Sequence, residues 1–408
     1  MKILNLPAYC YPEETASSHL IRNKDEAYNK EGFYRLVYAP TPTRGIDEAT
    51  YEKYKRIKKE IKDNGLTTIY RFPMFREGKN PLQRGFRYIL CWFIHLYYGL
   101  KAKDCDLLLL GSTPPIQGLL GAIIKKQKHI PFIYNLQDIF PDSMVSTGMT
   151  HKGSLLWKVG RWIENKTYKA ADKIIVISQD FKNNLMAKGV PEEKIVVIYN
   201  WIDEKEVVDI PRSENILFDK YGLDRNKFYI TYNGNIGLTQ NMDMLMEVAK
   251  EIGDNMDIQF VLVGNGAYKD KLEKIIEEGN IKNVTLLPFQ PYEDIAHVFS
   301  LGDVSLVISK PGVGANSVPS KTWSIMSASR PVLANFDENE LKTIIENNKC
   351  GVFTKAGDKK AFVDAIFYLY NNKEVAKEMG RNGRIFIENN LSKEVGVSKY
   401  IDLIKSLV

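Results

Sequence analysis

The segment SKPGVGANSVPSKT, residues 309–322, concentrates the small and polar residues that suit an anionic ligand. It follows the apolar run DVSLVI and precedes TWSIMSA, so we expect a strand, a glycine loop and the first turn of a helix. The backbone N–H groups of such a loop and of a helix N-terminus attract phosphate. Pro319 suits the first helical position, and Lys321 and Lys310 would add full positive charges. The segment therefore predicts a phosphate-binding loop.

The ending Ser320-Lys321-Thr322 is similar to the end of an ATP-binding P-loop, but the rest of the segment is not. A Walker A loop has the pattern GxxxxGK[ST], whereas Ser320 precedes the lysine here and the spacing from Gly314 does not fit. The segment also lies three-quarters of the way along the chain, whereas a P-loop usually follows an early strand. The sequence therefore argues against an ATPase and favours a different phosphate-bearing ligand.

Other strand candidates in the second half also end in glycine or proline. They are followed by Gly234-Asn235-Ile236-Gly237, by Gly264-Asn265-Gly266 and by Pro288-Phe289-Gln290-Pro291. A glycine after one strand usually marks only a turn, but ligands of open α/β sheets bind beyond the carboxyl ends of the strands. The coincidence of several such ends predicts a ligand site along one edge of a sheet.

The elements that must position this site alternate along the whole chain. Strand candidates in the first half are 2–7, 34–40, 67–73, 106–112, 132–138, 173–178 and 194–200, and those in the second half are 228–237, 258–266, 284–289, 304–309, 331–336 and 350–355. Helix-length segments separate these apolar runs, which is typical of parallel sheets with helices on both faces. The pattern breaks near 200–212. The sequence therefore predicts an α/β protein with two Rossmann-like domains in tandem.

Composition narrows the class of protein further. A chain of 408 residues with 44% hydrophobic and 26% charged residues fits a globular protein of two domains. No apolar run approaches the ~18 residues that a membrane span needs, and the first residues do not look like a secretory signal. The four cysteines are far apart and the five histidines show no ligand spacing, so we expect neither a disulfide framework nor a metal site.

Charge is distributed unevenly along the chain. Residues 1–200 contain 31 Lys and Arg against 20 Asp and Glu, whereas residues 201–408 contain 25 against 30. A basic first half favours an anionic partner such as a membrane surface or a phosphate-bearing substrate, and no nucleic-acid-binding motif is present. Residues 81–104 predict either a helix that docks on a membrane or a buried helix. The basic run 51–63 is a candidate for a basic surface that meets the anionic partner, and the alternative is a simple solvated helix face.

The second half resembles the GT-B glycosyltransferases of family 4, most clearly from about 228 to 390. The segments VLVGNGAYKDKLEKI, VTLLPFQPYEDIAHVFSLGDVSLV and VPSKTWSIMSASRPVLA resemble those of the family in their order, and NLQDIFPDSMVSTGM extends the resemblance into the first half. The VPSKT and DIFPDS elements are most similar to a bacterial surface-polysaccharide subgroup, which includes N-acetyl-L-fucosamine transferases of O-antigen and capsule synthesis. The resemblance implies an acceptor-binding domain over 1–204, completed by a helix at 391–408, and a nucleotide-sugar-binding domain over 205–390, facing a central cleft.

The resemblance also implies a UDP-sugar donor and a retaining transfer that needs no cofactor or metal. Two acidic residues of the family's donor loop fall here on Asn316 and Ser324, and the Arg and Lys that hold its diphosphate fall on Asn235 and Gln240. Lys321 becomes the first candidate for the diphosphate, with Lys310 as the second. The other candidates on the donor side are Gly234, Asn265, Gln290, Gly314, Ser317 and Ser320.

In the first half, the family's glycine-rich turn falls on residues 14–18. Thr15 and Ser17 there can cap the next helix or donate hydrogen bonds to a phosphate. Asp138 follows the position where the family often has a histidine, and it is a candidate to accept the proton of the acceptor hydroxyl. It can equally hold the acceptor or a neighbouring backbone group, and Asp142 is a second carboxylate nearby in sequence.

Together these features predict a cytoplasmic transferase attached peripherally to the inner face of the cell membrane. It would move a sugar, an N-acetylated deoxyhexose by the resemblance, from UDP to an undecaprenyl-diphosphate-linked saccharide. One alternative is a UDP-sugar 2-epimerase of the same fold, which would require more carboxylate and histidine residues in the cleft. A second is a degenerate transferase that acts as a binding partner in an assembly complex, which the four lost charges favour and Lys321 disfavours.

Overall fold

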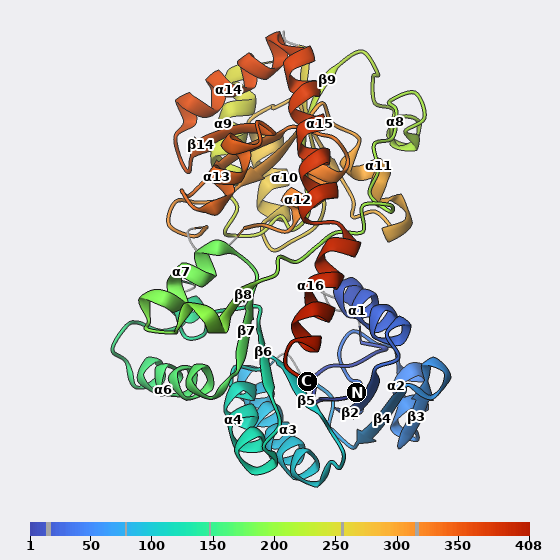
Figure 1. The fold of residues 1–408 in the computed structure, drawn as a ribbon. Coiled ribbons are helices and arrows are strands. Elements are labelled where there is room, and N and C mark those ends of the chain that lie inside the picture. Colours follow the sequence, from blue (N-terminus) through green and yellow to red (C-terminus); the bar gives the residue numbers. More distant parts are fainter. Residues whose placement is uncertain (14–17, 78–79, 147, 254–256, 315–317) are drawn as a thin grey trace. The chain divides into compact units, whose positions relative to one another are not determined.

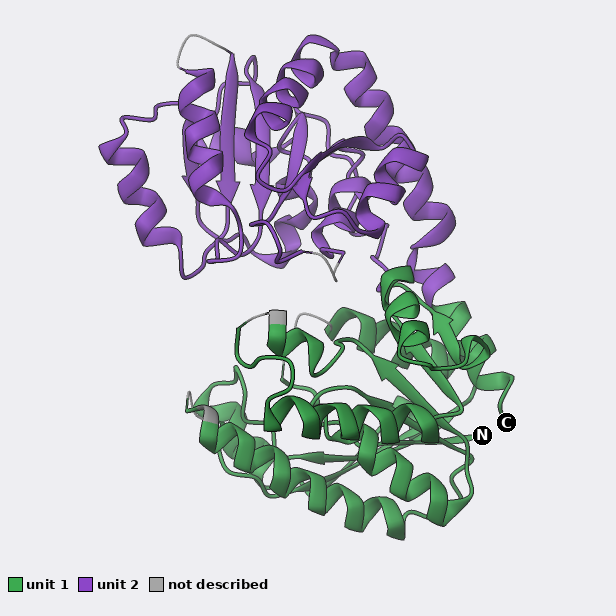
Figure 2. Ribbon diagram, turned by 90° about the vertical axis from the view of Figure 1, so that its left-hand side faces the viewer, with its two compact units in different colours: residues 1–199, 397–408 green, residues 200–396 purple. Residues whose placement is uncertain are grey.

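The computed structural model describes residues 1–13, 18–77, 80–146, 148–253, 257–314 and 318–408. The chain forms two compact units, one of Met1–Tyr199 with Val397–Val408 and one of Asn200–Gly396 (Figure 2). The division therefore falls a few residues before the expected end of the first domain at 204. The second unit also runs beyond the expected 390, so only the last part of the C-terminal helix α16 (Lys393–Lys405) returns to the first unit.

The first unit is built on an eight-stranded sheet. Its strands are β1 (Lys2–Asn5), β2 (Tyr34–Pro40), β3 (Lys59–Lys62), β4 (Thr67–Phe72), β5 (Leu107–Gly111), β6 (Phe132–Leu136), β7 (Lys173–Val176) and β8 (Ile195–Val197). They lie in the order β3-β4-β2-β1-β5-β6-β7-β8, and every neighbouring pair is parallel except β3 with β4. Runs such as Leu107–Leu110 are buried throughout, as expected for strands that are covered on both faces.

Helices cover both faces of this sheet (Figure 1). They are α1 (Ser18–Lys30), α2 (Glu48–Lys55), α3 (Pro81–Lys101), α4 (Gln117–Lys128), α5 (Asp142–Ser146), α6 (Leu155–Ala170) and α7 (Gln179–Ala187), with short 3-10 turns at Asp63–Gly65 and Glu192–Lys194. Helix α4 packs between α3 and α6 on one face, and α1 and α16 lie together on the other.

The basic run at 51–63 does not form the single solvated helix face that its charge pattern predicts. Helix α2 ends at Lys55, and Lys59–Lys62 forms the antiparallel edge strand β3. Lysines on an edge strand hinder pairing with another chain, so this basic run is consistent with an exposed sheet edge. The helical pattern of charges misled the prediction because a short edge strand has almost no apolar signature of its own.

The second unit has a six-stranded sheet in which all neighbours are parallel. Its strands are β9 (Phe228–Asn233), β10 (Ile258–Val263), β11 (Val284–Leu287), β12 (Val304–Ile308), β13 (Val332–Phe336) and β14 (Gly351–Lys355). The order is β11-β10-β9-β12-β13-β14, which is the strand order 3-2-1-4-5-6 of a Rossmann fold. The predicted fold class of two Rossmann-like α/β domains is confirmed.

Helices enclose the second sheet and complete its core. They are α8 (Ile216–Tyr221), α9 (Met242–Ile252), α10 (Lys269–Glu278), α11 (Ile295–Phe299), α12 (Lys321–Ser327), α13 (Glu340–Asn347), α14 (Lys359–Asn371) and α15 (Lys373–Asn390), with a 3-10 turn at Tyr292–Asp294. Met242, Leu245 and Ile366 are fully buried against the strands. This rigid core fixes the loops that follow the strands.

Candidate functional site

The strand order of the second unit reverses between β9 and β12. Chain connections leave β9 and β12 in opposite directions along the sheet, and it is at such a reversal, beyond the carboxyl ends of the strands, that open α/β sheets bind ligands. The loop after β9 begins at Gly234. The loop after β12 belongs to the segment 309–322 and leads to Lys321 at the start of α12. The predicted phosphate-binding loop therefore lies at the place where open α/β sheets bind ligands.

The glycines after β9 and β10 are required by backbone packing. A Cβ on Gly264 would lie 1.9 Å from the carbonyl oxygen of Gly234, and one on Gly266 would lie 2.3 Å from that of Ile236. The N–H of Gly234 donates to Val263, and the N–H of Ile236 donates to Asn265. These two loops form one interlocked layer whose amides are engaged within the protein, so the glycines shape the site rather than supply free donors.

The amine of Lys321 lies against this glycine layer. Its Nζ is 3.6 Å from the centroid of the Tyr232 ring, and it would be 3.5 Å from a Cβ placed on Gly234. The Tyr232 hydroxyl donates to the carbonyl of Asn235, which fixes the ring at the end of β9. Lys321 has neither a carboxylate nor a hydrogen-bond acceptor among the residues that the structure describes. Its charge is therefore available to a ligand.

Burial lowers the pKa of the Lys321 amine to about 7. The shift has one cause, the removal of the ammonium group from water, because no carboxylate compensates it. The face of the Tyr232 ring attracts a cation, so it is the one contact that favours the charged form. An anion bound beside this amine would supply the missing opposite charge and raise its pKa.

The loop after β12 is held by a residue that the sequence analysis missed. Asp337 follows β13, and its carboxylate accepts hydrogen bonds from the N–H groups of Gly312 (2.9 Å) and Gly314 (2.7 Å). The carbonyl of Gly314 accepts from the side chain of Asn339. The N–H of Gly314 was expected to face a phosphate, but in this conformation it is already paired. Lys321, and not the Gly314 amide, is the group that is free to bind an anion here.

The polar residues after β9 and β10 mainly organise their own loops. The side-chain oxygen of Gln240 accepts from the N–H of Gly237 at 3.0 Å, and that of Asn265 accepts from the N–H of Gly266 at 2.8 Å. Asn235 is exposed beside them. Neither Asn235 nor Gln240 carries a charge, so Lys321 is left as the cation of this layer.

Gln290 lies in a different part of the unit from Lys321. It follows β11 at the sheet edge, two strands away from β9, and its side chain is 5% exposed. Its amide bonds with the Tyr221 hydroxyl, the Lys220 amine and the carbonyl of Pro288. The hydrogen-bonding atoms of the Gln290 side chain are thus all occupied, and only the backbone of this segment remains to contact the nucleotide of a donor.

Lys310, Ser320 and Ser324 complete the described donor-side candidates. The N–H of Lys310 donates to the carbonyl of Thr239, which ties the loop after β12 to the loop after β9, and its amine lies 5.8 Å from the centroid of the Tyr268 ring. Ser320 is exposed at the start of α12, and Ser324 is half-buried one turn later. Four candidates, Thr15, Ser17, Asn316 and Ser317, lie outside the residues that the structure describes.

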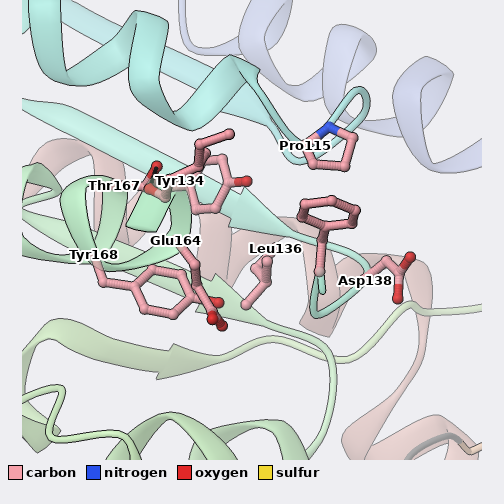
Figure 3. Close-up of a pocket in the computed structure, with 9 residues that line it drawn as sticks. Pro115, Tyr134, Leu136, Asp138, Glu164, Thr167 and Tyr168 are labelled. Carbon is pink, nitrogen blue, oxygen red and sulfur yellow. Dashed lines mark hydrogen bonds between the residues drawn. The ribbon is translucent and has the colours of Figure 1, made fainter. Parts of the chain in front are cut away.

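In the first unit, Asp138 lies at the carboxyl edge of the sheet, just after β6. It is exposed, and its Oδ2 accepts a hydrogen bond from the Ser143 hydroxyl at 3.0 Å. Asp138 lines a small cavity of about 10 Å³, which has room for about one water molecule. Figure 3 shows the Asp138 carboxylate at one end of this cavity, with Glu164 and Tyr168 at the other.

The second carboxylate named by the sequence analysis is engaged in the fold. Asp142 lies 2.7 Å from the amine of Lys188, which also contacts Glu164 at 2.8 Å. Asn184 donates to Asp142 as well, at 3.3 Å. These contacts tie α5, α6 and α7 together, so Asp142 has a structural role and Asp138 is the carboxylate that remains accessible.

Tyr232 and Asp337 are candidate site residues that the sequence patterns did not single out. Tyr232 lies in a strand of mainly apolar residues. The one sequence signal for it is its position directly before Asn233 and Gly234, at the carboxyl end of the strand. Asp337 follows another strand and could have been found by examining every carboxyl end of the sheet. The described residues contain no group of three or more histidine, cysteine, aspartate or glutamate side chains that could hold a metal ion.

Comparison with known families agrees with this arrangement. Residues 22–206 match the family described as Glycosyltransferase Family 4, and residues 213–386 match Glycosyl transferases group 1. The two matches follow the two units of the structure and together extend over most of the chain. The chain thus consists of a family 4 domain and a group 1 domain, and it is a glycosyltransferase of the GT-B type.

Curated relatives support this class. The Probable glycosyltransferase WbjE of Pseudomonas aeruginosa is 25% identical over 342 residues, which cover 83% of this chain and 84% of the relative. The Escherichia coli K12 protein WcaI, described as a colanic acid biosynthesis glycosyl transferase, is 24% identical over 282 residues, which cover 67% of each chain. Both are glycosyltransferases by name, so the predicted enzyme class is confirmed at this level.

Solved structures show the same fold. Anabaena HepE in complex with UDP superposes with a TM-score of 0.73 at 17% identity and 100% coverage of both chains. WaaG, a glycosyltransferase involved in lipopolysaccharide biosynthesis, superposes with a TM-score of 0.67 at 12% identity and 99% coverage of both chains. The predicted GT-B fold is confirmed.

Proposed function

We propose that this glycosyltransferase moves a sugar from a UDP-sugar to a saccharide acceptor, with retention of anomeric configuration and without a bound metal. One observation carries the donor half of the proposal. The unpaired amine of Lys321 lies at the strand-order reversal of the second unit, against the glycine layer of Gly234 and Gly264. A diphosphate placed there would receive a full positive charge. Relatives with similar folds have been solved with UDP, which supports the choice of nucleotide.

In this proposal Lys321 is a catalytic residue because it touches the leaving group. As the bond between sugar and diphosphate breaks, negative charge grows on the phosphate oxygen, and a cation fixed beside that oxygen stabilises the transition state. Asp138 is the candidate to orient the acceptor hydroxyl or to take its proton, since it is exposed at the carboxyl edge of the other sheet.

The donor test is a calorimetric titration of the purified protein with UDP, GDP, ADP and CMP, without added metal. We expect UDP to bind most tightly. Binding that is equal for all four nucleotides would contradict a UDP site. Absence of binding to every nucleotide would instead favour the degenerate assembly partner. The comparisons do not favour the UDP-sugar 2-epimerase, and conversion of a UDP-sugar without any acceptor would be needed to revive it.

The acceptor we propose is a saccharide linked to undecaprenyl diphosphate, and the sugar an N-acetylated deoxyhexose, as in O-antigen or capsule synthesis. The polysaccharide pathway named for WcaI supports the surface-polysaccharide setting. A lipid-linked acceptor requires an enzyme that works at the inner membrane surface. No helix among the described residues is both long and apolar enough to cross a bilayer. An exposed apolar surface that contacts the membrane would suit such an acceptor.

Helix α3 offers such a surface. One side of the helix packs into the unit through Arg87, Cys91 and His95, which are all buried. The opposite side is apolar and exposed, with large side chains at intervals of three or four residues: Leu82, Phe86, Ile89, Phe93, Tyr97 and Leu100. Helix α3 thus has one buried face and one exposed apolar face.

Helix α6 adds a second exposed apolar group on the same face of the sheet, formed by Leu155, Leu156, Val159 and Trp162. Arg84 and Lys101 lie near the ends of α3. An apolar patch bordered by cations is complementary to the acyl chains and head groups of an anionic bilayer. We therefore propose that α3 and α6 dock on the membrane.

Replacing Phe86 and Phe93 together with serine should reduce binding to anionic vesicles by at least tenfold, because each buried aromatic side chain contributes about 1.5–3 kcal/mol. The measurement is co-sedimentation with vesicles of phosphatidylcholine and phosphatidylglycerol. Ile385→Ser in α15, which removes an equally exposed apolar side chain from the second unit, is the matched control and should bind normally. Equal binding of all three proteins would contradict the docking surface.

A further inference from the structure

The guanidinium group of Arg87 lies inside the first unit. Arg87 is 0% exposed, and none of its three side-chain nitrogens makes a hydrogen bond to a residue that the structure describes. Oε2 of Glu77 lies 3.9 Å from Nη1, which is within ion-pair distance but too far for a hydrogen bond. Buried charged groups normally have their hydrogen bonds filled, and one that does not is a reason to look for a ligand.

Two other buried arginines of the same unit behave differently. Arg35 and Arg71 are also nearly inaccessible to solvent, and each donates several hydrogen bonds. Their partners are carboxylates, a hydroxyl group and backbone carbonyls: Asp25, Asp63 and Thr67 for Arg35, and Glu60, Pro40 and Tyr11 for Arg71. The two terminal nitrogens of Arg35 are thus paired although its Nε also lacks a partner, whereas Arg87 makes no hydrogen bond through any of its three nitrogens within the described part of the chain.

Arg87 faces loops that follow three adjacent strands, β1, β2 and β4. Its Cζ lies 5.1 Å from the centroid of the Tyr9 ring in the loop after β1, and the Cζ of Arg44, after β2, lies 5.3 Å from the same ring. Glu77 follows β4. Thr43, beside Arg44, has a buried hydroxyl group for which the described ranges also contain no hydrogen-bond partner. Unfilled hydrogen-bonding groups thus gather at the carboxyl edge of the sheet, which is the edge that also presents Asp138.

The carboxylates of this cluster are already engaged by other groups. Glu13 accepts from the backbone N–H groups of Thr43, Arg44 and Cys10. Glu77 accepts from the Tyr9 hydroxyl at 2.7 Å and contacts Arg84 at 2.9 Å. Counting only the described residues of these loops, the cluster contains three arginines, at 44, 84 and 87, against these two carboxylates. The Arg87 guanidinium lies within ion-pair distance of Glu77, and none of its donors makes a hydrogen bond there.

We propose that Arg87 binds an anionic oxygen group of the phosphate type that enters among these loops. The arginine fork matches such a group, because two parallel N–H donors reach two oxygens. In the proposed transferase, on which this identification rests, the group is a phosphate of the acceptor's diphosphate. Arg87 is covered in the present conformation, so the Tyr9 and Arg44 side chains must move aside when the anion enters.

The test uses thermal unfolding of the full chain in a Lys321→Met background, which removes the cation of the donor site. Inorganic pyrophosphate should raise the unfolding temperature of this variant by a few degrees, because a ligand that binds only the folded state stabilises it. The additional change Arg87→Met should abolish the shift, and Arg87→Lys, which loses the fork, should reduce it. Arg71→Met is the matched control: it should lower the unfolding temperature and leave the pyrophosphate shift intact.

A pyrophosphate shift that is absent in the Lys321→Met protein, or that persists after Arg87→Met, would overturn the proposal. If Arg87→Met does not fold, hydrogen exchange of the Lys321→Met protein replaces it. Pyrophosphate should then slow exchange in residues 5–13, 41–47 and 73–77, and unchanged exchange there would overturn the site. The UDP affinity of the single variant Arg87→Met should equal that of the wild type. The proposal for the Arg87 site and the proposal for the donor site can therefore be refuted separately.

A further arm distinguishes the sources of the anion. Inorganic phosphate, inorganic pyrophosphate and a prenyl diphosphate in detergent micelles are compared on the Lys321→Met protein. Tighter binding of the prenyl diphosphate, lost with Arg87→Met, supports a lipid-linked acceptor. Equal binding of prenyl diphosphate and pyrophosphate supports the anion site and overturns its assignment to the acceptor.

Discussion

Replacing Lys321 with methionine is expected to weaken UDP binding by about 10- to 100-fold, because a hydrogen bond to a charged group is worth about 1.5–3 kcal/mol. Methionine keeps most of the apolar part of the side chain beside Tyr232, so the loss of UDP affinity measures the effect of removing the charge. Lys274→Met, at an exposed position of α10 in the same unit, is the matched control. Calorimetry measures the affinity, and equal UDP affinity of wild type and Lys321→Met would refute the diphosphate assignment.

The same substitution should stabilise the ligand-free protein. Below pH 7 the wild type buries an ammonium group that has no carboxylate partner, and methionine removes this cost of about 1–3 kcal/mol. Affinity and stability are thus expected to change in opposite directions, which a damaged fold cannot produce. Chemical unfolding at pH 6 measures the stability, and a Lys321→Met protein that is less stable than the wild type would contradict the unpaired charge.

The pH dependence follows from the sign of the pKa shift. Unfolded lysine keeps its proton to about pH 10.4, whereas folded Lys321 releases it near pH 7, so the unfolded state binds more protons between these values. Wild-type stability should gain from Lys321 as pH rises through this window, and Lys321→Met should lack that gain. The affinity for a UDP-sugar needs the charged amine and should fall above pH 7, by up to about tenfold per pH unit.

Gly264→Ala is expected to have the other large effect, a loss of about 3 kcal/mol in the free energy of unfolding of the second unit. The added Cβ would lie 1.9 Å from the backbone oxygen of Gly234, so the two loops must separate. Since the Lys321 amine rests on this layer, UDP affinity should fall as well. Thermal unfolding should show a decrease of about 6–12 °C.

Gly85→Ala in α3 is the control for the change of residue type. A Cβ there would meet no atom within 4 Å, and alanine favours a helix, so the variant should be as stable as the wild type or slightly more so. A Gly264→Ala protein that matched Gly85→Ala in unfolding temperature and in UDP affinity would show that the two loops are not interlocked as described.

The sequence by itself determined the local elements of this protein. Buried strands such as β5 and β12 appear as continuous apolar runs because both of their faces are covered, and the helices between them carry their own periodicity. Glycine at the strand ends is also a local signal, because a close backbone approach excludes any side chain. The candidate residues Gly234, Gly314 and Lys321 could therefore be named in advance, and the resemblance supplied the expectation of a UDP-sugar.

Only the tertiary structure decided which groups meet. Strand order brings Lys321 to the ring of Tyr232 and to Gly234, although almost ninety residues separate them in the chain, and no local pattern encodes such a contact. The hydrogen bond from the Gly314 N–H to Asp337 also joins segments that are distant in the sequence. The surroundings of the Arg87 guanidinium, which makes no hydrogen bond to a described residue, are likewise set by packing between distant segments. Periodicity reports how deeply a residue is buried, whereas the partner of a buried charge is fixed by packing between distant segments.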